Sequence, residues 1–111
     1  MFKSKNWNFV IMEKNVNFGK AVEALKEGKL VYREGWHRTG MFVMKQIPAE
    51  IGLDIIPKMQ SVQDSLKKEL LYRGITLKYN NQLLLIQPDG TADSWNASSA
   101  DIFAEDWVIK D

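Results

Sequence analysis

The most restrictive feature of the sequence is a helical repeat of apolar residues near its start. From Phe18 to Leu25 these residues recur at three- and four-residue spacing. Asn17 can cap the free backbone amides at the start of such a helix, and Gly28 can end it in a left-handed conformation. The segment therefore predicts a helix with defined ends.

The segments after this helix are typical of strands. Residues 30–33 and 41–46 predict two strands of a hairpin, joined by a wide loop over residues 34–40. Residues 47–60 contain two prolines and a glycine without a clear period, so we expect an irregular segment with one short helical turn near residues 49–53.

A second helix is predicted over residues 62–73. Ser61 and Asp64 have the spacing of a capping box at its start, and Gly74 can end it. The sequence therefore predicts two main helices, separated by the first hairpin and the irregular segment.

Strand-type residues return after the second helix. Residues 75–79 and 82–87 flank two asparagines at positions 80–81, which tolerate positive φ and suit a tight hairpin turn. Pro-Asp-Gly at positions 88–90 predicts a further turn, which leads into a strand over residues 91–95.

The C-terminal segment predicts one more helix and one more strand. Ser98 and Asp101 have the spacing of a second capping box, which opens a short helix that ends near Glu105. A strand over residues 107–109 follows, and the aromatic and β-branched residues at 7–12 predict a first strand.

This order of elements predicts an α+β fold in a single domain. We expect a mainly antiparallel sheet with the two main helices and one short C-terminal helix, because strands and helices do not alternate regularly. The domain is expected over residues 17–111. Residues 1–16 are expected as an N-terminal extension that can add an edge strand.

Composition excludes several classes of function. The 15 Lys and Arg residues are balanced by 14 Asp and Glu residues, so no nucleic-acid polymer or anionic membrane is expected as a partner. The chain has no cysteine and its one histidine, His37, lacks further ligands, so we expect neither a metal site nor a cofactor. No apolar run is long enough to span a membrane, and we expect a cytoplasmic protein.

Two of the four tryptophans, Trp36 and Trp95, stand in polar surroundings at predicted strand ends. An aromatic face stacks on a nucleobase with about 1–3 kcal/mol. Neighbouring side chains can meet phosphate oxygens, ribose hydroxyls or a base edge. They are Arg33, Arg38, Asn96 and Ser99. The alternative, equally supported by composition, is that both tryptophans close the ends of the core, while Trp107 is expected to be structural.

Carboxylates cluster near the C-terminus, at Asp101, Glu105 and Asp106. Paired carboxylates can carry out acid–base chemistry when their pKa values differ. The favoured interpretation is structural, because Asp101 can cap its helix, Glu105 can be solvated and Asp106 can turn the chain. His37, alone in its loop, is in the same way more simply explained without a catalytic role.

Four pieces of the sequence, taken together, resemble a known family. They are residues 17–29, Arg33-Glu34-Gly35-Trp36, Gly40-Met41-Phe42 and Ala104-Glu105-Asp106-Trp107. In this order and spacing they resemble the Thoeris anti-defence type-two family of phage proteins, over residues 17–110.

This resemblance implies a protein that binds without catalysis. Members of the family are sponges that form homo-oligomers, commonly tetramers. They sequester cyclic ADP-ribose-type signals that host TIR-domain enzymes make, and some also bind cyclic oligonucleotides in a separate pocket. The resemblance therefore implies a phage protein in the bacterial cytoplasm that holds a cyclic nucleotide intact between protomers and so prevents activation of the host effector.

The resemblance also implies roles for single residues. Trp36 corresponds to a base-stacking residue, and Arg33 to a phosphate or structural partner. Asn96, Asp101 and Asp106 are weaker transfers from the C-terminal motif. Two alternatives stay open: a structural or protein-interaction module, in which the tryptophans are core and interface anchors, and a nucleotide-cleaving enzyme that uses the C-terminal carboxylates.

Overall fold

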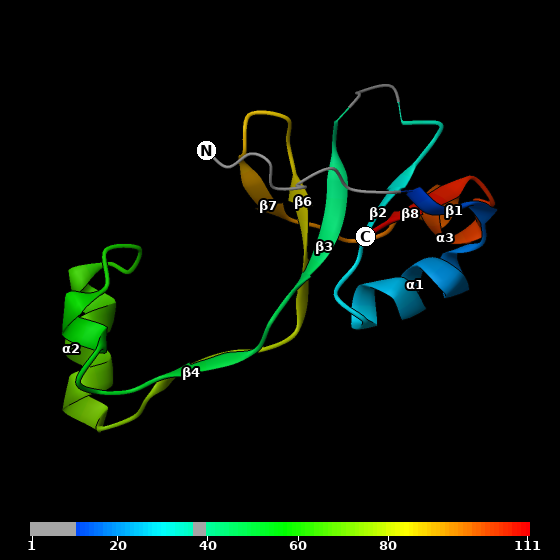
Figure 1. The fold of residues 1–111 in the computed structure, drawn as a ribbon. Coiled ribbons are helices and arrows are strands. Elements are labelled where there is room, and N and C mark those ends of the chain that lie inside the picture. Colours follow the sequence, from blue (N-terminus) through cyan, green and yellow to red (C-terminus); the bar gives the residue numbers. More distant parts are fainter. Residues whose placement is uncertain (1–10, 37–39) are drawn as a thin grey trace, which may run out of the picture. The chain divides into compact units, whose positions relative to one another are not determined.

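The computed structural model describes residues 11–36 and 40–111 (Figure 1). The chain divides into two compact units, each with its own sheet. One, called here the sheet unit, comprises the residues up to Lys45 together with Gln82–Asp111, and the other is the 46–81 unit, Gln46–Asn81. No described helix is both long enough and apolar enough to cross a membrane.

A six-stranded sheet forms the centre of the sheet unit, with the strand order β1-β8-β2-β3-β6-β7. The strands are β1 (Ile11–Val16), β2 (Leu30–Arg33), β3 (Phe42–Gln46), β6 (Gln82–Ile86), β7 (Ala92–Ser94) and β8 (Trp107–Lys110). Neighbours β1–β8, β8–β2, β2–β3 and β6–β7 are antiparallel. The predicted α+β class and mainly antiparallel sheet are confirmed.

Helix α1 (Phe18–Lys26) begins and ends as its sequence predicts. The side chain of Asn17 accepts a hydrogen bond of 2.9 Å from the backbone N–H of Lys20, and Gly28 has a φ of 87°. The helix contacts β8 and β2, the second and third strands of the six-stranded sheet. Its apolar stripe therefore packs on this pair of strands.

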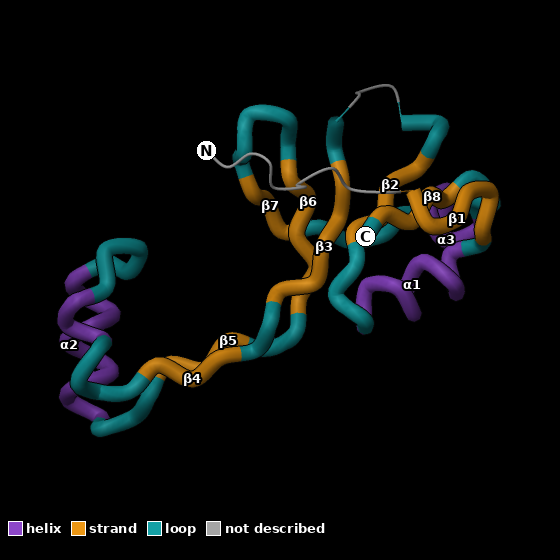
Figure 2. Tube along the Cα trace, in the orientation of Figure 1, coloured by secondary structure: helices purple, strands orange, loops and turns teal. Residues whose placement is uncertain are grey.

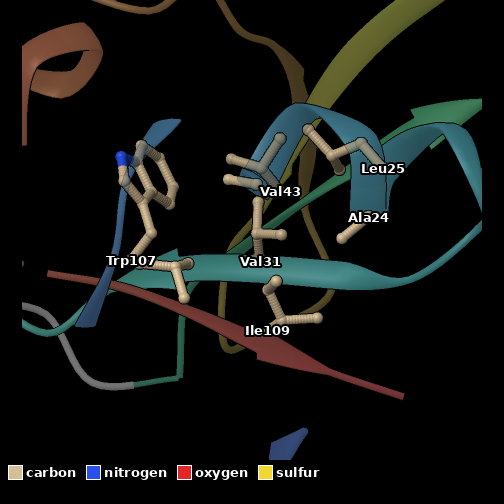
Figure 3. Packing of buried hydrophobic residues seen from close by; sticks show 8 residues of the cluster. Ala24, Leu25, Val31, Val43, Trp107 and Ile109 are labelled. Carbon is tan, nitrogen blue, oxygen red and sulfur yellow. The ribbon is translucent and has the colours of Figure 1, made fainter. Parts of the chain in front are cut away.

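The core of the sheet unit lies between α1 and this sheet. Figure 3 shows Ala24 and Leu25 of the helix in one cluster with side chains of three strands, namely Val31 of β2, Val43 of β3, and Trp107 and Ile109 of β8. Each of these six residues is at most 5% exposed. Truncation of such large buried side chains to alanine costs about 2–5 kcal/mol, so this cluster accounts for much of the stability of the unit.

The C-terminal part of the sheet unit also follows its sequence signals. The turn at positions 88–90 is present, with the Gly90 backbone N–H bonded to the Gln87 carbonyl at 2.9 Å. Helix α3 (Ser99–Phe103) starts with the predicted capping box of Ser98 and Asp101, and it ends two residues before the predicted Glu105. The last strand, predicted over residues 107–109, lies inside the sheet between β1 and β2.

The first strand differs from its prediction. Strand β1 covers Ile11–Val16 and forms one edge of the sheet, whereas the sequence predicted residues 7–12. Residues 7–10 lie outside the described residues. Pairing with β8 sets the end of this strand, because Val16 lies opposite Trp107.

The 46–81 unit holds a two-stranded sheet and a helix (Figure 2). Its elements are β4 (Ala49–Ile51), the 3-10 helix η1 (Ile56–Lys58), α2 (Asp64–Arg73) and β5 (Leu77–Tyr79). Ile56 and Leu70 are its buried apolar residues. Gly74 ends α2 with a left-handed φ of 66°, as its sequence predicts.

Three predictions for this part of the chain are wrong. The helical turn near residues 49–53 is strand β4, because Ala49–Ile51 pairs with Leu77–Tyr79, a partner distant in sequence. The capping box of Ser61 is absent: α2 starts at Asp64, and its cap residue Gln63 makes no side-chain cap hydrogen bond.

The hairpin at positions 80–81 is the third. Strands β5 and β6 belong to different sheets, and neither asparagine has a positive φ. Both strands are occupied by other partners, β5 by β4 and β6 by β7, so the turn signal between them is not used.

Candidate functional site

Two motifs from opposite ends of the domain meet at the junction of β2 and β8. Arg33, the last residue of β2, lies opposite Trp107, the first residue of β8. One step beyond this pair, the backbone N–H of Glu34 donates to the carbonyl of Asp106 at 3.0 Å. The Arg-x-Gly-Trp and Ala-Glu-Asp-Trp pieces are therefore neighbours in space because their two strands are.

Arg33 is the centre of the charged part of this site. Its Nε donates to Asp106 Oδ1 at 3.0 Å and its Nη1 to Asp101 Oδ1 at 3.1 Å. The side chain is 22% exposed. The hydrogen bond to Asp106 contributes most to raising the pKa of Arg33, so the guanidinium is a permanent cation held between two carboxylates.

The second oxygen of each carboxylate also accepts a hydrogen bond. Asp106 Oδ2 accepts from the backbone N–H of Gly35 at 2.8 Å. Asp101 Oδ2 accepts from the backbone N–H of Ser98 at 3.0 Å and from the Ser98 hydroxyl at 2.9 Å. The Trp36 side chain also helps to lower the pKa of Asp101. All four carboxylate oxygens thus bind groups of the protein itself.

These contacts determine the ionisation of both carboxyls. Burial by itself would raise the pKa of Asp101, but the hydrogen bonds from Ser98, Arg33 and Trp36 outweigh it and lower that pKa. Burial likewise opposes the effect of Arg33 and Gly35 on Asp106, whose pKa is also lowered. Both side chains are therefore carboxylates at neutral pH.

The close approach of Asp106 explains why position 35, in the Arg-x-Gly-Trp motif, is a glycine. A Cβ atom built on Gly35 would lie 2.8 Å from Asp106 Oδ2, closer than Cβ atoms are found to such neighbours. The same oxygen accepts the Gly35 N–H, so Asp106 approaches the backbone as closely as only glycine allows.

The aromatic part of the site consists of three tryptophans in mutual contact. Trp107 is fully buried, and its Nε1 donates to the carbonyl of Asp101 at 2.9 Å. Trp36 lies 5.6 Å from Trp107 and Trp95 lies 6.2 Å from it, measured between ring centroids. Trp36 and Trp95 are 6.3 Å apart. All three pairs are edge-to-face, the arrangement that aromatic quadrupoles favour.

Trp107 is structural, as the sequence predicts. The positions of Trp36 and Trp95 are compatible with both interpretations, a residue that closes the end of the core and a residue that contacts a ligand. Each is packed against the core cluster, which agrees with a role in closing its end. Each is also only half-buried, so part of its surface is exposed.

The remaining predicted site residues are less constrained. Asn96, next to Trp95, and Ser99, at the start of α3, are both exposed. Arg38 and His37 lie outside the described residues. Among the residues that the structure describes, no group of His, Cys, Asp and Glu could hold a metal ion.

Sequence reasoning missed the role of two residues in this site. Gly35 supplies a donor to Asp106, and Trp107 connects the two other tryptophans. The contact of Ser98 with Asp101, in contrast, was indicated by the capping-box spacing. Nothing in the sequence indicated that Gly35 contacts Asp106, which is 71 residues away.

The fold and this site together define a class of protein: a small α+β domain whose two end motifs join in an arginine–carboxylate–tryptophan cluster. The Tad2-like family model, described as the Thoeris anti-defense 2-like domain, matches residues 16–110. The chain therefore belongs to this family, as its motifs predict.

A relative from Bacillus phage SP01 agrees with this assignment. It is named Thoeris anti-defense 2 and is 28% identical over 98 residues, which are 88% of this chain and 98% of the relative. The family and the origin of this relative support a phage anti-defence role for the chain.

Proposed function

We propose that the protein binds a cyclic nucleotide immune signal of the cyclic ADP-ribose type and sequesters it without cleaving it. By lowering the free concentration of the signal, it blocks activation of the host effector. Family membership supports the anti-defence role. The observation that carries the finer proposal is the pair Trp36 and Trp95, half-buried and 6.3 Å apart, beside exposed polar side chains.

The chemistry of these side chains suits such a ligand. A cyclic ADP-ribose isomer offers a base, ribose hydroxyls and a pyrophosphate. The open surface of either tryptophan can contact the base, with about 1–3 kcal/mol for a stacked face. The amide of Asn96 and the hydroxyl of Ser99 can meet ribose hydroxyls or the base edge. Arg38 stays a predicted phosphate donor from outside the described residues.

A sponge needs affinity, because it competes with the host receptor for the signal. Nanomolar binding corresponds to about −12 kcal/mol. The tryptophans are held by contacts with one another, and Asp106 is held by Arg33 and Gly35, so little ordering is required when a ligand binds. Such preorganisation lowers the cost of association and supports tight binding by a small site.

The state of the two carboxylates favours a binding protein over an enzyme. A general acid must hold a proton near neutral pH, and hydrogen bonds lower the pKa of both Asp101 and Asp106. Their oxygens are also engaged by donors of the protein. These observations support a protein that releases its ligand unchanged over a nucleotide-cleaving enzyme.

We also propose that the protein is a homo-oligomer, such as a tetramer, with ligand sites between protomers. Two apolar residues of α3 support this: Phe103 is 82% exposed and Ile102 is 45% exposed. They stand on the short helix that begins with Ser99, so a second copy that covers them would lie beside the predicted ligand contacts. Mass measurement under native conditions, with Phe103→Ser as the variant expected to weaken association, tests this.

One alternative keeps a specific observation in its favour. The three tryptophans pack edge-to-face against the core, which also suits a structural or protein-interaction module. In that case Trp36→Ala lowers the melting temperature and no cyclic nucleotide binds. The sponge proposal predicts that Trp36→Ala also weakens binding, measured at a temperature where the variant is folded.

The proposal is tested by titration calorimetry with a panel of cyclic ADP-ribose isomers and cyclic dinucleotides. We expect one isomer to bind, and we expect Asn96→Ala and Ser99→Ala each to weaken its binding about tenfold, for one lost hydrogen bond of about 1.4 kcal/mol. Both residues are exposed, so the fold should persist. The matched control is Asn80→Ala in the 46–81 unit. Absence of binding by every compound in the panel contradicts the proposal.

A further inference from the structure

Arg33 and Asp106 belong to a hydrogen-bonded network around the turn that carries Trp36. We propose that both are positioning residues, which hold Trp36 in its ligand-binding orientation and do not themselves contact the ligand. This inference rests on the proposed function. It differs from the motif-based prediction, in which Arg33 contacts a phosphate of the ligand directly.

The charge of the network argues against a phosphate contact. One guanidinium and two carboxylates sum to +1 − 2 = −1, with both carboxylates within 3.1 Å of Arg33. A pyrophosphate that approached this group would meet a net negative charge. Two of the three guanidinium nitrogens already donate to carboxylates. Arg33 is therefore poorly suited to bind an anion, although its residue type predicted that role.

The contacts instead converge on the turn that carries Trp36. Asp106 holds this turn twice, since its Oδ2 accepts the Gly35 N–H and its carbonyl accepts the Glu34 N–H. The backbone N–H of Trp36 donates to the carbonyl of Arg33 at 3.2 Å. The Trp36 side chain also acts on Asp101, where it helps to lower the pKa of the carboxyl that Arg33 binds.

Arg33 links the two halves of this arrangement. Its fork spans from Asp106, which binds the backbone before Trp36, to Asp101, the carboxyl whose pKa the Trp36 side chain helps to lower. A side chain with a single donor group cannot reproduce two separate hydrogen bonds in this fixed geometry. Both carboxylates and the guanidinium are therefore needed to keep the indole in place before a ligand arrives.

Two variants test the proposal: Asp106→Asn, which loses the charge of one carboxylate, and Arg33→Lys, which keeps the positive charge but loses the fork. The control is Asp64→Asn, the same chemical change at an exposed carboxylate of the 46–81 unit. Affinity for the cyclic ADP-ribose isomer that the unmodified protein binds is measured by calorimetry, at a temperature where far-UV circular dichroism shows native structure. Near-UV circular dichroism reports the packing of the tryptophans.

The direction of the change in affinity discriminates the two roles. If Arg33 bound a phosphate of the ligand, Asp106→Asn would release the guanidinium from one carboxylate and remove a negative charge, so the affinity for the ligand would rise. We expect the opposite: both variants weaken binding about tenfold and alter the near-UV signal, while Asp64→Asn changes neither. Binding that is stronger or unchanged in Asp106→Asn overturns the proposal.

The near-UV signal separates a failure of this inference from a failure of the proposed function. If the unmodified protein binds no isomer, the proposed function is wrong and the ligand part of this inference falls with it. The spectrum of Asp106→Asn then decides the positioning part on its own. An unaltered spectrum in the folded variant shows that Asp106 does not hold Trp36.

Discussion

Replacement of Gly35 by alanine should destabilise the protein through a single contact. The φ of Gly35 lies outside the left-handed region, so the backbone itself accepts alanine. The new Cβ, however, would lie 2.8 Å from Asp106 Oδ2. This oxygen is not free to move without loss, because Asp106 is bonded to Arg33 as well as to the Gly35 N–H.

The magnitude follows from the bond that must break. A hydrogen bond to a charged group contributes about 1.5–3 kcal/mol, and the Asp106 side chain is 30% exposed, so we take about 2 kcal/mol. Alanine recovers about 0.4–1 kcal/mol by restricting the unfolded chain. The free energy of unfolding should fall by about 1–2 kcal/mol, which lowers the melting temperature by about 5–10 °C for a domain of this size.

Thermal unfolding followed by circular dichroism measures this effect, and a double-mutant cycle identifies its cause. In an Asp106→Ala background the clash is gone, so Gly35→Ala should be neutral or slightly stabilising. Gly19→Ala in α1 is the control, where alanine meets only an ordinary contact and should stabilise by about 0.5–1 kcal/mol. If Gly35→Ala lowers the free energy of unfolding equally with and without Asp106, contact with Asp106 is not the cause of the destabilisation.

Three further predictions concern stability. Because the folded state lowers the pKa of Asp101 and Asp106, their contribution to the free energy of unfolding is complete above about pH 4 and is lost as pH falls through the lowered pKa values. Urea unfolding of the Asp101→Asn/Asp106→Asn variant should therefore show a weaker dependence of stability on acid pH, and an equal dependence in both proteins would contradict this. Ser98→Ala removes the capping box of α3 and should cost about 1 kcal/mol by thermal unfolding, so an unchanged melting temperature would be evidence against that role. Replacement of the 46–81 unit by a short asparagine–glycine turn should leave a sheet unit that folds cooperatively. The reason is that β3 and β6 are neighbours in the sheet and the core cluster lies outside the replaced segment. A shortened protein without a cooperative unfolding transition would disprove this.

Elements with local signals could be predicted from the sequence. The cap of α1 at Asn17, the turn at positions 88–90 and the capping box of Ser98 each depend on contacts a few residues apart. Such contacts leave a recognisable spacing in the chain. The helix, the turn and the α3 start were therefore predicted close to their observed limits.

Elements that depend on distant partners could not be predicted in this way. Strand β4 is three residues long and exists through its ladder with β5, and the asparagine pair at positions 80–81 lies between strands of different sheets. The local sequence of either segment is compatible with another structure. Tertiary pairing overrides such weak local preferences.

The candidate site shows the same division. The residue types of Arg33 and Trp36 predicted a binding site, and the two motifs indicated which residues to consider. Their pairing with Asp101 and Asp106 follows from the register of β2 and β8, which no local pattern specifies. The sequence therefore indicated the members of the site, and only the structure gives the contacts that determine their roles.

The proposed function requires that the protein hold a cyclic nucleotide without transforming it. The most direct measurement is to incubate the purified protein with cyclic ADP-ribose isomers, remove unbound compound, denature the protein by heat and determine the mass and chromatographic position of what is released. We expect recovery of one isomer, chemically unchanged and in a fixed ratio to protein. Recovery of a cleaved product, or of nothing, would contradict it.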